Sequence, residues 1–177
     1  TIFNKDKIHR PRNPEIYKAP YVLFKKGLDC ADYSIRAVYT ESDFLYRETI
    51  NCIKGSEKDK KTLLNLCGLL NSSLFSYFNL MLGSSTGIER EQIFLEELGN
   101  YPYVYNDELV ELVEKMQREE WGKNRNELQV ALNQCVMRMY GLQDNYFVDY
   151  ALSIQIPMLC GTYQETKCDA KTMKEYV

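Results

Sequence analysis

The side chains of this 177-residue chain offer little material for catalysis. The one histidine is His9, in a segment rich in Pro and Arg, so a Ser-His-Asp set and a histidine-based metal site have almost no material. No Walker loop or Gly-x-Gly-x-x-Gly segment occurs, and Gly83 and Gly87 are too close together for a phosphate-binding loop. Adjacent acidic pairs such as Glu96 and Glu97 diverge by about 100° on a helix, as solvated surface residues do. These residues predict a binding module instead of an enzyme.

Positive side chains are concentrated near the amino terminus, although the net charge of the chain is −3. Residues 1–80 contain 13 Lys and Arg against 9 Asp and Glu, whereas residues 81–177 contain 9 against 16. The excess lies in Lys5, Lys7, Arg10, Arg12, Lys18, Lys25 and Lys26. A solvated charged terminus is one explanation of this run, and a phosphate-binding surface is the other.

Three short extended segments in the first half predict the strands of a small mixed sheet. Residues 21–24 and 35–39 are rich in β-branched and aromatic residues, and residues 44–53 alternate between two faces. The face of the third segment that we expect to be buried contains Phe44, Tyr46, Ile50 and Cys52.

A single helix over residues 63–81 is expected to form the centre of the core. Its apolar residues follow the i, i+3, i+4 spacing and leave only a narrow polar stripe. Ser56 and Asp59, three residues apart, are typical of a capping box before such a helix. Gly83 and Gly87 then predict a polar turn that ends the helix.

Beyond Asn106 the spacing of the apolar residues becomes helical and predicts an antiparallel hairpin, followed by a third helix over residues 145–156 that stops at Pro157. The expected fold is therefore α+β, with a small sheet around a central buried helix and a helical carboxyl-terminal region. The expected domain division is an α+β recognition domain over residues 1–106, with an extended basic entry segment, and a helical appendage over residues 107–177.

Six cysteines without a Cys-x-x-Cys pair indicate reduced thiols. Cys52, Cys67 and Cys135 lie in apolar segments, as small core residues do. The most apolar stretch, residues 63–82, contains asparagines and serines that a lipid-facing helix would leave unsatisfied. We therefore expect a cytoplasmic protein without a membrane partner and, because residue 1 is Thr, a piece of a longer chain.

Several blocks of sequence occur in a recognisable order. Residues 69–78 read Leu-Leu-Asn-Ser-Ser-Leu-Phe-Ser-Tyr-Phe, and residues 83–93 read Gly-Ser-Ser-Thr-Gly-Ile-Glu-Arg-Glu-Gln-Ile. The basic, proline-containing residues 10–27 precede them, and Val-Met-Arg-Met-Tyr-Gly-Leu follows at residues 136–142. Over roughly residues 10–156 the chain resembles the TaqI-like C-terminal specificity domain of type IIG and related adenine-specific restriction-modification DNA methyltransferases, most specifically in the first two blocks.

This resemblance implies a bacterial target-recognition domain that binds double-stranded DNA. In such enzymes a separate catalytic domain binds S-adenosylmethionine and holds the extruded adenine with an Asn-Pro-Pro-aromatic motif. Here Asn13-Pro14 continues into Glu15, so the motif is absent from the sequence. The chain is therefore expected to have no methyltransferase activity and no cofactor of its own, and to select the site for a missing methyltransferase domain.

Candidate DNA-binding residues come from two segments, because cationic side chains neutralise phosphates and polar side chains beside glycines can approach the backbone and the base edges. They are Arg10, Arg12, Lys18, Lys25 and Lys26 of the entry segment, and Ser84, Ser85, Thr86, Arg90 and Gln92 after the central helix. One site requires that both segments share one surface. The alternative function is a protein-interaction or oligomerisation module, in which residues 107–156 dock on the methyltransferase domain, another subunit or a second copy.

Overall fold

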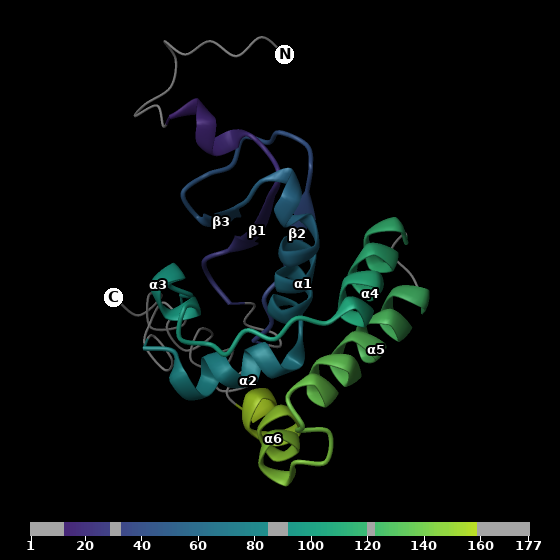
Figure 1. Ribbon diagram of the computed structural model, residues 1–177. Coiled ribbons are helices and arrows are strands. Elements are labelled where there is room, and N and C mark those ends of the chain that lie inside the picture. Colours follow the sequence, from purple (N-terminus) through teal and green to yellow (C-terminus); the bar gives the residue numbers. More distant parts are fainter. Residues whose placement is uncertain (1–12, 29–32, 85–91, 120–122, 159–177) are drawn as a thin grey trace, which may run out of the picture.

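The expected α+β class is confirmed by the computed structural model, which describes residues 13–28, 33–84, 92–119 and 123–158. Figure 1 shows the small sheet beside α1, with the long helices α4 and α5 on the other side of that helix. In chain order the elements are η2 (Pro14–Tyr17), β1 (Tyr21–Lys25), β2 (Ala37–Thr40), β3 (Ile50–Lys54), η3 (Glu57–Asp59), α1 (Lys60–Leu70), α2 (Ser73–Leu82), α3 (Leu95–Leu98), α4 (Asp107–Arg118), α5 (Lys123–Met139), α6 (Tyr146–Tyr150) and the π-helical turn η4 (Ala151–Gln155).

The central strand of the sheet is β1, in the order β2-β1-β3. Both pairings are antiparallel, where a mixed sheet was expected. Phe24 pairs with Ala37 of β2 on one side and with Asn51 of β3 on the other. The end of β1 and the beginnings of both neighbouring strands therefore lie at the same end of the sheet.

The third strand is shorter than predicted, because the Ile50 N–H donates to the Arg47 carbonyl (3.0 Å) and closes a turn that interrupts the alternation. Phe44, expected to be buried, is 53% exposed. The buried side chain of β3 is instead Asn51, whose Nδ2 donates to the Ile93 carbonyl at 3.0 Å. The predicted buried face of this segment is therefore wrong.

The predicted single central helix is two helices, α1 and α2, which meet at Asn71 and Ser72. The Asn71 side chain bonds to the edge of β2, accepting from the Ala37 N–H (3.1 Å) and donating to the Ala37 carbonyl (2.8 Å). Ser72 Oγ accepts from the Phe75 N–H at 3.2 Å and caps α2. The break was not predicted because Ser72 fits the narrow polar stripe of one continuous helix, and the apolar spacing continues on both sides of Asn71.

Most of the remaining local signals agree with the structure, with one exception at the end of the third helix. Asp59 Oδ2 accepts from the N–H (2.8 Å) and the hydroxyl (2.7 Å) of Ser56, as the capping box predicted. The hairpin of α4 and α5 is confirmed, and Gly141, with φ +66°, follows the end of α5 in the left-handed conformation that glycine favours. The third helical segment continues through Met158 and does not stop before Pro157.

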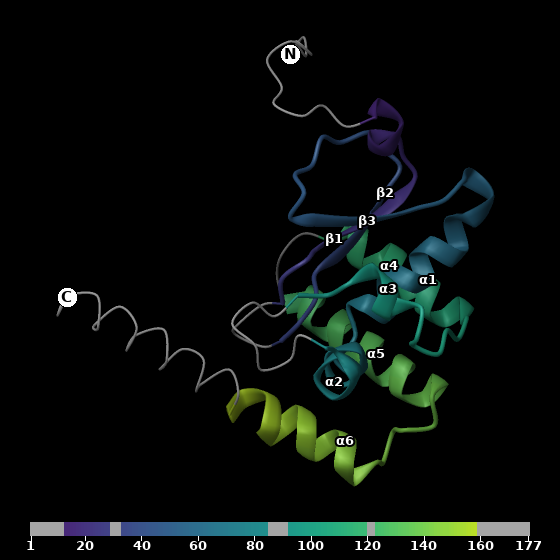
Figure 2. The same ribbon diagram turned by 90° about the vertical axis from the view of Figure 1, so that its left-hand side faces the viewer.

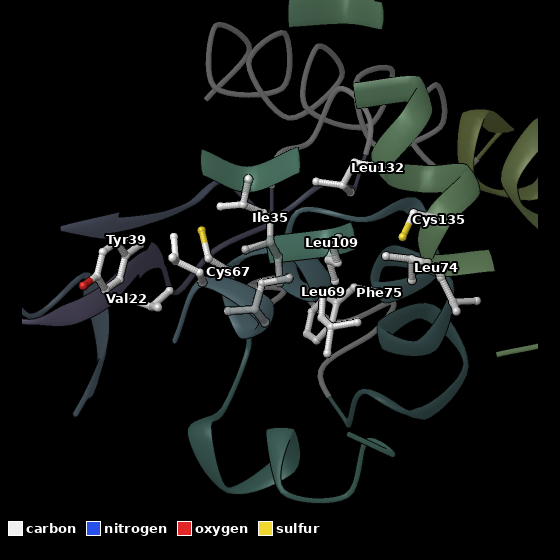
Figure 3. Packing of buried hydrophobic residues seen from close by; sticks show 14 of the residues in the cluster. Val22, Ile35, Tyr39, Cys67, Leu69, Leu74, Phe75, Leu109, Leu132 and Cys135 are labelled. Atoms are coloured by element: carbon white, nitrogen blue, oxygen red, sulfur yellow. The ribbon is translucent and has the colours of Figure 1, made fainter. Parts of the chain in front are cut away.

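One core joins the sheet to the helical region. Figure 3 shows side chains from β1, α1, α4 and α5 packed together, among them Val22, Cys67, Leu109 and Leu132. Figure 2, turned by 90°, shows α6 below this core, and Val148 of α6 belongs to it. The core cluster therefore contains residues from both sides of position 106.

Candidate nucleic-acid interface

Cationic side chains gather at the end of the sheet where β1 ends and its two neighbours begin. The Lys26 N–H donates to the Thr49 carbonyl (2.9 Å), so the turn before β3 lies beside the residues that follow β1. Arg36 directly precedes β2, whose first residue pairs with Phe24. The basic end of the sheet consists of Lys25, Lys26, Arg36 and Arg47, of which all but the half-buried Lys26 are exposed.

The chain returns to this end of the sheet at Gln92. Gly27 and Gln92 form an isolated antiparallel bridge, and the Ile93 N–H donates to the Lys26 carbonyl at 2.7 Å. On the buried face of the sheet, the Asn51 side-chain amide donates a hydrogen bond to the Ile93 carbonyl. Of the predicted site residues, the structure therefore brings together Lys25, Lys26 and Gln92, which come from two segments more than sixty residues apart in sequence.

Lys18 lies at the opposite end of the sheet. Its Nζ is 2.7 Å from Glu15 Oε1, and this bond raises the pKa of Lys18 and lowers the pKa of Glu15. A strand rises about 3.3 Å per residue, so β1 alone separates Lys18 from Lys25 by more than about 13 Å. Lys18 is therefore not part of the basic end of the sheet.

Ser84 is exposed, but its donors are occupied. Its N–H donates to Glu97 Oε1 at 3.3 Å, and its hydroxyl donates to the same oxygen. A phosphate would have to displace this carboxylate to use either donor. The other predicted site residues, Arg10, Arg12, Ser85, Thr86 and Arg90, lie outside the described residues.

Arg36 and Arg47 were not among the predicted site residues. Each lies just before a strand that runs antiparallel to β1, so antiparallel pairing of three predicted strands would have placed both beside Lys25. Glu48, next to Arg47, is an exposed acidic residue at the same turn. The local balance of the described side chains at this end is nevertheless positive.

The described residues contain no clustered metal ligands, and the described thiols are buried or half-buried. Among the described residues no group of three or more His, Cys, Asp or Glu is placed to hold a metal ion. Burial raises the pKa of the Cys67 thiol to about 12, and Cys52 and Cys135 are also free cysteines. An apolar cavity of about 70 Å³ between α1, α2, α5 and residues 98–103 is lined mostly by leucine and aromatic side chains.

Within the described ranges, no helix combines the length and the apolar character needed to cross a bilayer. No protein-family model matches the chain, and no match is found among curated proteins. The fold and the basic end of the sheet are therefore the observations on which a functional proposal has to be built.

Proposed function

We propose that this chain is the DNA target-recognition domain of a bacterial restriction-modification adenine methyltransferase, and that it is not catalytic itself. The observation that carries the proposal is the pairing of Gly27 with Gln92, which joins the last candidate residue after the central helix to the segment of Lys25 and Lys26. Candidate residues from two distant parts of the sequence thus meet at one cationic surface. The methyl donor, S-adenosylmethionine, would be bound by the missing catalytic domain, and the whole enzyme would act in the cytoplasm.

The chemistry of the basic end of the sheet suits the phosphates of a duplex. Lysine and arginine neutralise phosphate charge and release condensed counterions, which gives sequence-independent affinity that falls as salt rises. No ion pair is given for Lys25, Lys26 or Arg47 among the described residues, so contact with phosphate breaks no described pair. Gln92, half-buried beside them, is of a residue type that can pair with adenine in the major groove.

The proposal is tested by measuring duplex DNA binding by the 177-residue chain over a range of salt concentrations. Replacing Lys25 and Lys26 together by alanine should lower the affinity and reduce the slope of log K against log salt by roughly 1.8, which is two phosphate contacts. The matched control replaces Lys58 and Lys115, which are exposed on η3 and α4, and changes the charge by the same amount. Equal effects of the two double variants, or binding that does not respond to salt, would contradict the proposal.

A second candidate function, protein docking through the helical region, is favoured by the exposed aromatic face of α6. Tyr146 and Phe147 are 71% and 74% exposed, and Tyr146 stacks on Tyr150 with ring centroids 6.2 Å apart. Exposed aromatic groups of this kind are enriched at protein interfaces. Sedimentation velocity of the chain, with a Tyr146→Ser plus Phe147→Ser variant for comparison, tests for a second copy as the partner. A monomer at high concentration for both proteins would leave only a different partner for this face.

A further inference from the structure

A groove of about 750 Å³ extends from the basic end of the sheet to the helical hairpin. It lies between β2, the junction of α1 with α2, and the helices α4 and α5, and Arg36 belongs both to the groove and to the basic end of the sheet. The polar side chains that matter for its chemistry are Arg36, Asn71, Gln117, Arg125, Asn126, Gln129 and Asn133. The groove is therefore continuous with the proposed phosphate-binding surface.

The charge of this lining differs from that of the chain as a whole. The chain contains 25 Asp and Glu and only 22 Lys and Arg, yet no acidic residue is among the described residues that line the groove, whereas Arg36 and Arg125 are. A guanidinium nitrogen of Arg125 donates to the Met116 carbonyl at 3.0 Å, which fixes this arginine between α4 and α5. An anionic occupant would meet fixed positive charge and no described carboxylate.

An extended peptide that adds a strand to β2 does not fit this groove. Strand addition needs free backbone groups along a sheet edge. Here the N–H and the carbonyl of Ala37 are both bonded to the Asn71 side chain, and Gln117 Nε2 donates to the Tyr39 carbonyl at 2.8 Å. Three backbone groups on this edge are thus already bonded to amide side chains.

Two amide side chains of α5, those of Gln129 and Asn133, form hydrogen bonds within the fold. Gln129 Nε2 donates to the Asn71 carbonyl (3.0 Å) and to Asn133 Oδ1 (3.2 Å), and Asn133 Oδ1 also accepts from the Ser73 N–H (3.0 Å). In the described part of the chain, Asn133 Nδ2 and the whole Asn126 side chain have no hydrogen bond assigned to them. These groups remain as donors on a positively charged wall.

Donors of these types match the phosphate and sugar oxygens of a nucleic-acid backbone, which arginine, asparagine, glutamine and serine contact in protein–DNA complexes. A site that holds unstacked bases uses aromatic side chains as platforms, and no aromatic residue is among the described residues of this groove. The lining therefore favours a strand's backbone over its bases.

We infer that the groove between β2 and the α4–α5 hairpin binds the sugar–phosphate backbone of one strand of the duplex, reached over Arg36 from the basic end of the sheet. The inference rests on the proposed DNA-recognition function and extends it to Gln117 of α4 and to residues 125–133 of α5. It assigns the helical hairpin a direct part in DNA binding, beside its part in the core.

The test places a charge in the groove without breaking a described bond. Asn126→Asp adds a carboxylate to the lining, and the matched control Asn124→Asp makes the same change two residues earlier on α5, about 200° away around the helix and outside the groove. Duplex affinity should fall roughly three- to tenfold for Asn126→Asp relative to Asn124→Asp, because the new charge lies near a phosphate. Conversely, Asn126→Lys should raise the affinity and steepen the salt slope by about 0.9, more than Asn124→Lys does.

The outcomes separate this inference from the function on which it rests. If the Lys25 and Lys26 variant weakens binding while the residue 126 and 124 variants bind alike, duplex recognition stands and the groove contact is overturned. If the unmodified chain shows no salt-dependent duplex binding, both proposals fail. Thermal unfolding and circular dichroism of every variant establish that the differences in affinity arise in folded protein.

Discussion

The contact between Gly68 of α1 and Leu109 of α4 provides the sharpest test of how the two halves of the chain are joined. A Cβ atom added at Gly68 would lie 2.8 Å from Cγ and Cδ1 of Leu109 and 2.9 Å from Cγ2 of Val113. Such distances are too short for carbon atoms in contact, so the two helices approach this closely only because residue 68 has no side chain. Leu109 is fully buried against it.

Each substitution at this contact should destabilise the protein, but for opposite reasons. Leu109→Ala leaves a cavity and should cost about 2–5 kcal/mol. Gly68→Ala overpacks the contact at a cost of about 1–3 kcal/mol, against about 1 kcal/mol gained in helix propensity. In the double variant the smaller residue 109 makes room for the new methyl group. The double variant should therefore lose less stability than the two single losses added together, by about 1 kcal/mol or more.

The assay is urea unfolding followed by far-ultraviolet circular dichroism, with the free energy of unfolding obtained for all four proteins. A single transition that shifts in every variant is expected, because one core contains residues from the sheet, α1 and α4. If the two single-variant losses in unfolding free energy sum to the double-variant loss within about 0.5 kcal/mol, residues 68 and 109 are not in steric conflict. Two separate transitions, with only one displaced by Leu109→Ala, would refute the shared core.

Two further predictions concern the elements that position the site. Asn51→Ala should cost about 1–3 kcal/mol in unfolding free energy, because the buried Ile93 carbonyl loses its donor, and it should weaken duplex binding more than the exposed Asn100→Ala does. The hydroxyl and the N–H of Ser56 lower the pKa of the Asp59 carboxyl below its ordinary value of 3.8. The stabilisation from this cap is therefore fully present at pH values well above 3.8 and is lost as the pH falls through that value and below it. Asp59→Asn should flatten this part of the stability curve in unfolding measured between neutral pH and pH 3, and an unchanged curve would contradict the assignment.

Local sequence was enough to predict the elements whose signals lie within a few residues. The Ser56–Asp59 cap, the first strand, and the hairpin of α4 and α5 agree with the structure, since caps and apolar periodicity act over one or two turns. The break between α1 and α2 could not be predicted in this way. The helix is interrupted where the Asn71 side chain bonds to Ala37 at the edge of β2, and this partner lies more than thirty positions earlier in the chain.

The candidate site shows the same division between local and long-range information. The sequence offered Lys25, Lys26 and Gln92 as candidates but gave no distance between them, and it grouped Lys18 with the two lysines because those residues are near in sequence. Antiparallel pairing reverses this grouping: it carries Lys18 to the far end of β1 and brings Arg36 and Arg47 to the near end.

The order of the residues by itself determined the approximate positions of the first two strands and of the helical regions, and which half of the chain is rich in positive charge. The tertiary structure decided which side chain of β3 is buried, where the central helix ends, and which cations share a surface. The physical reason is that helix periodicity and capping depend on neighbours within a turn. Strand register, core contacts and a groove between distant elements depend instead on chain segments that meet only when the whole core forms.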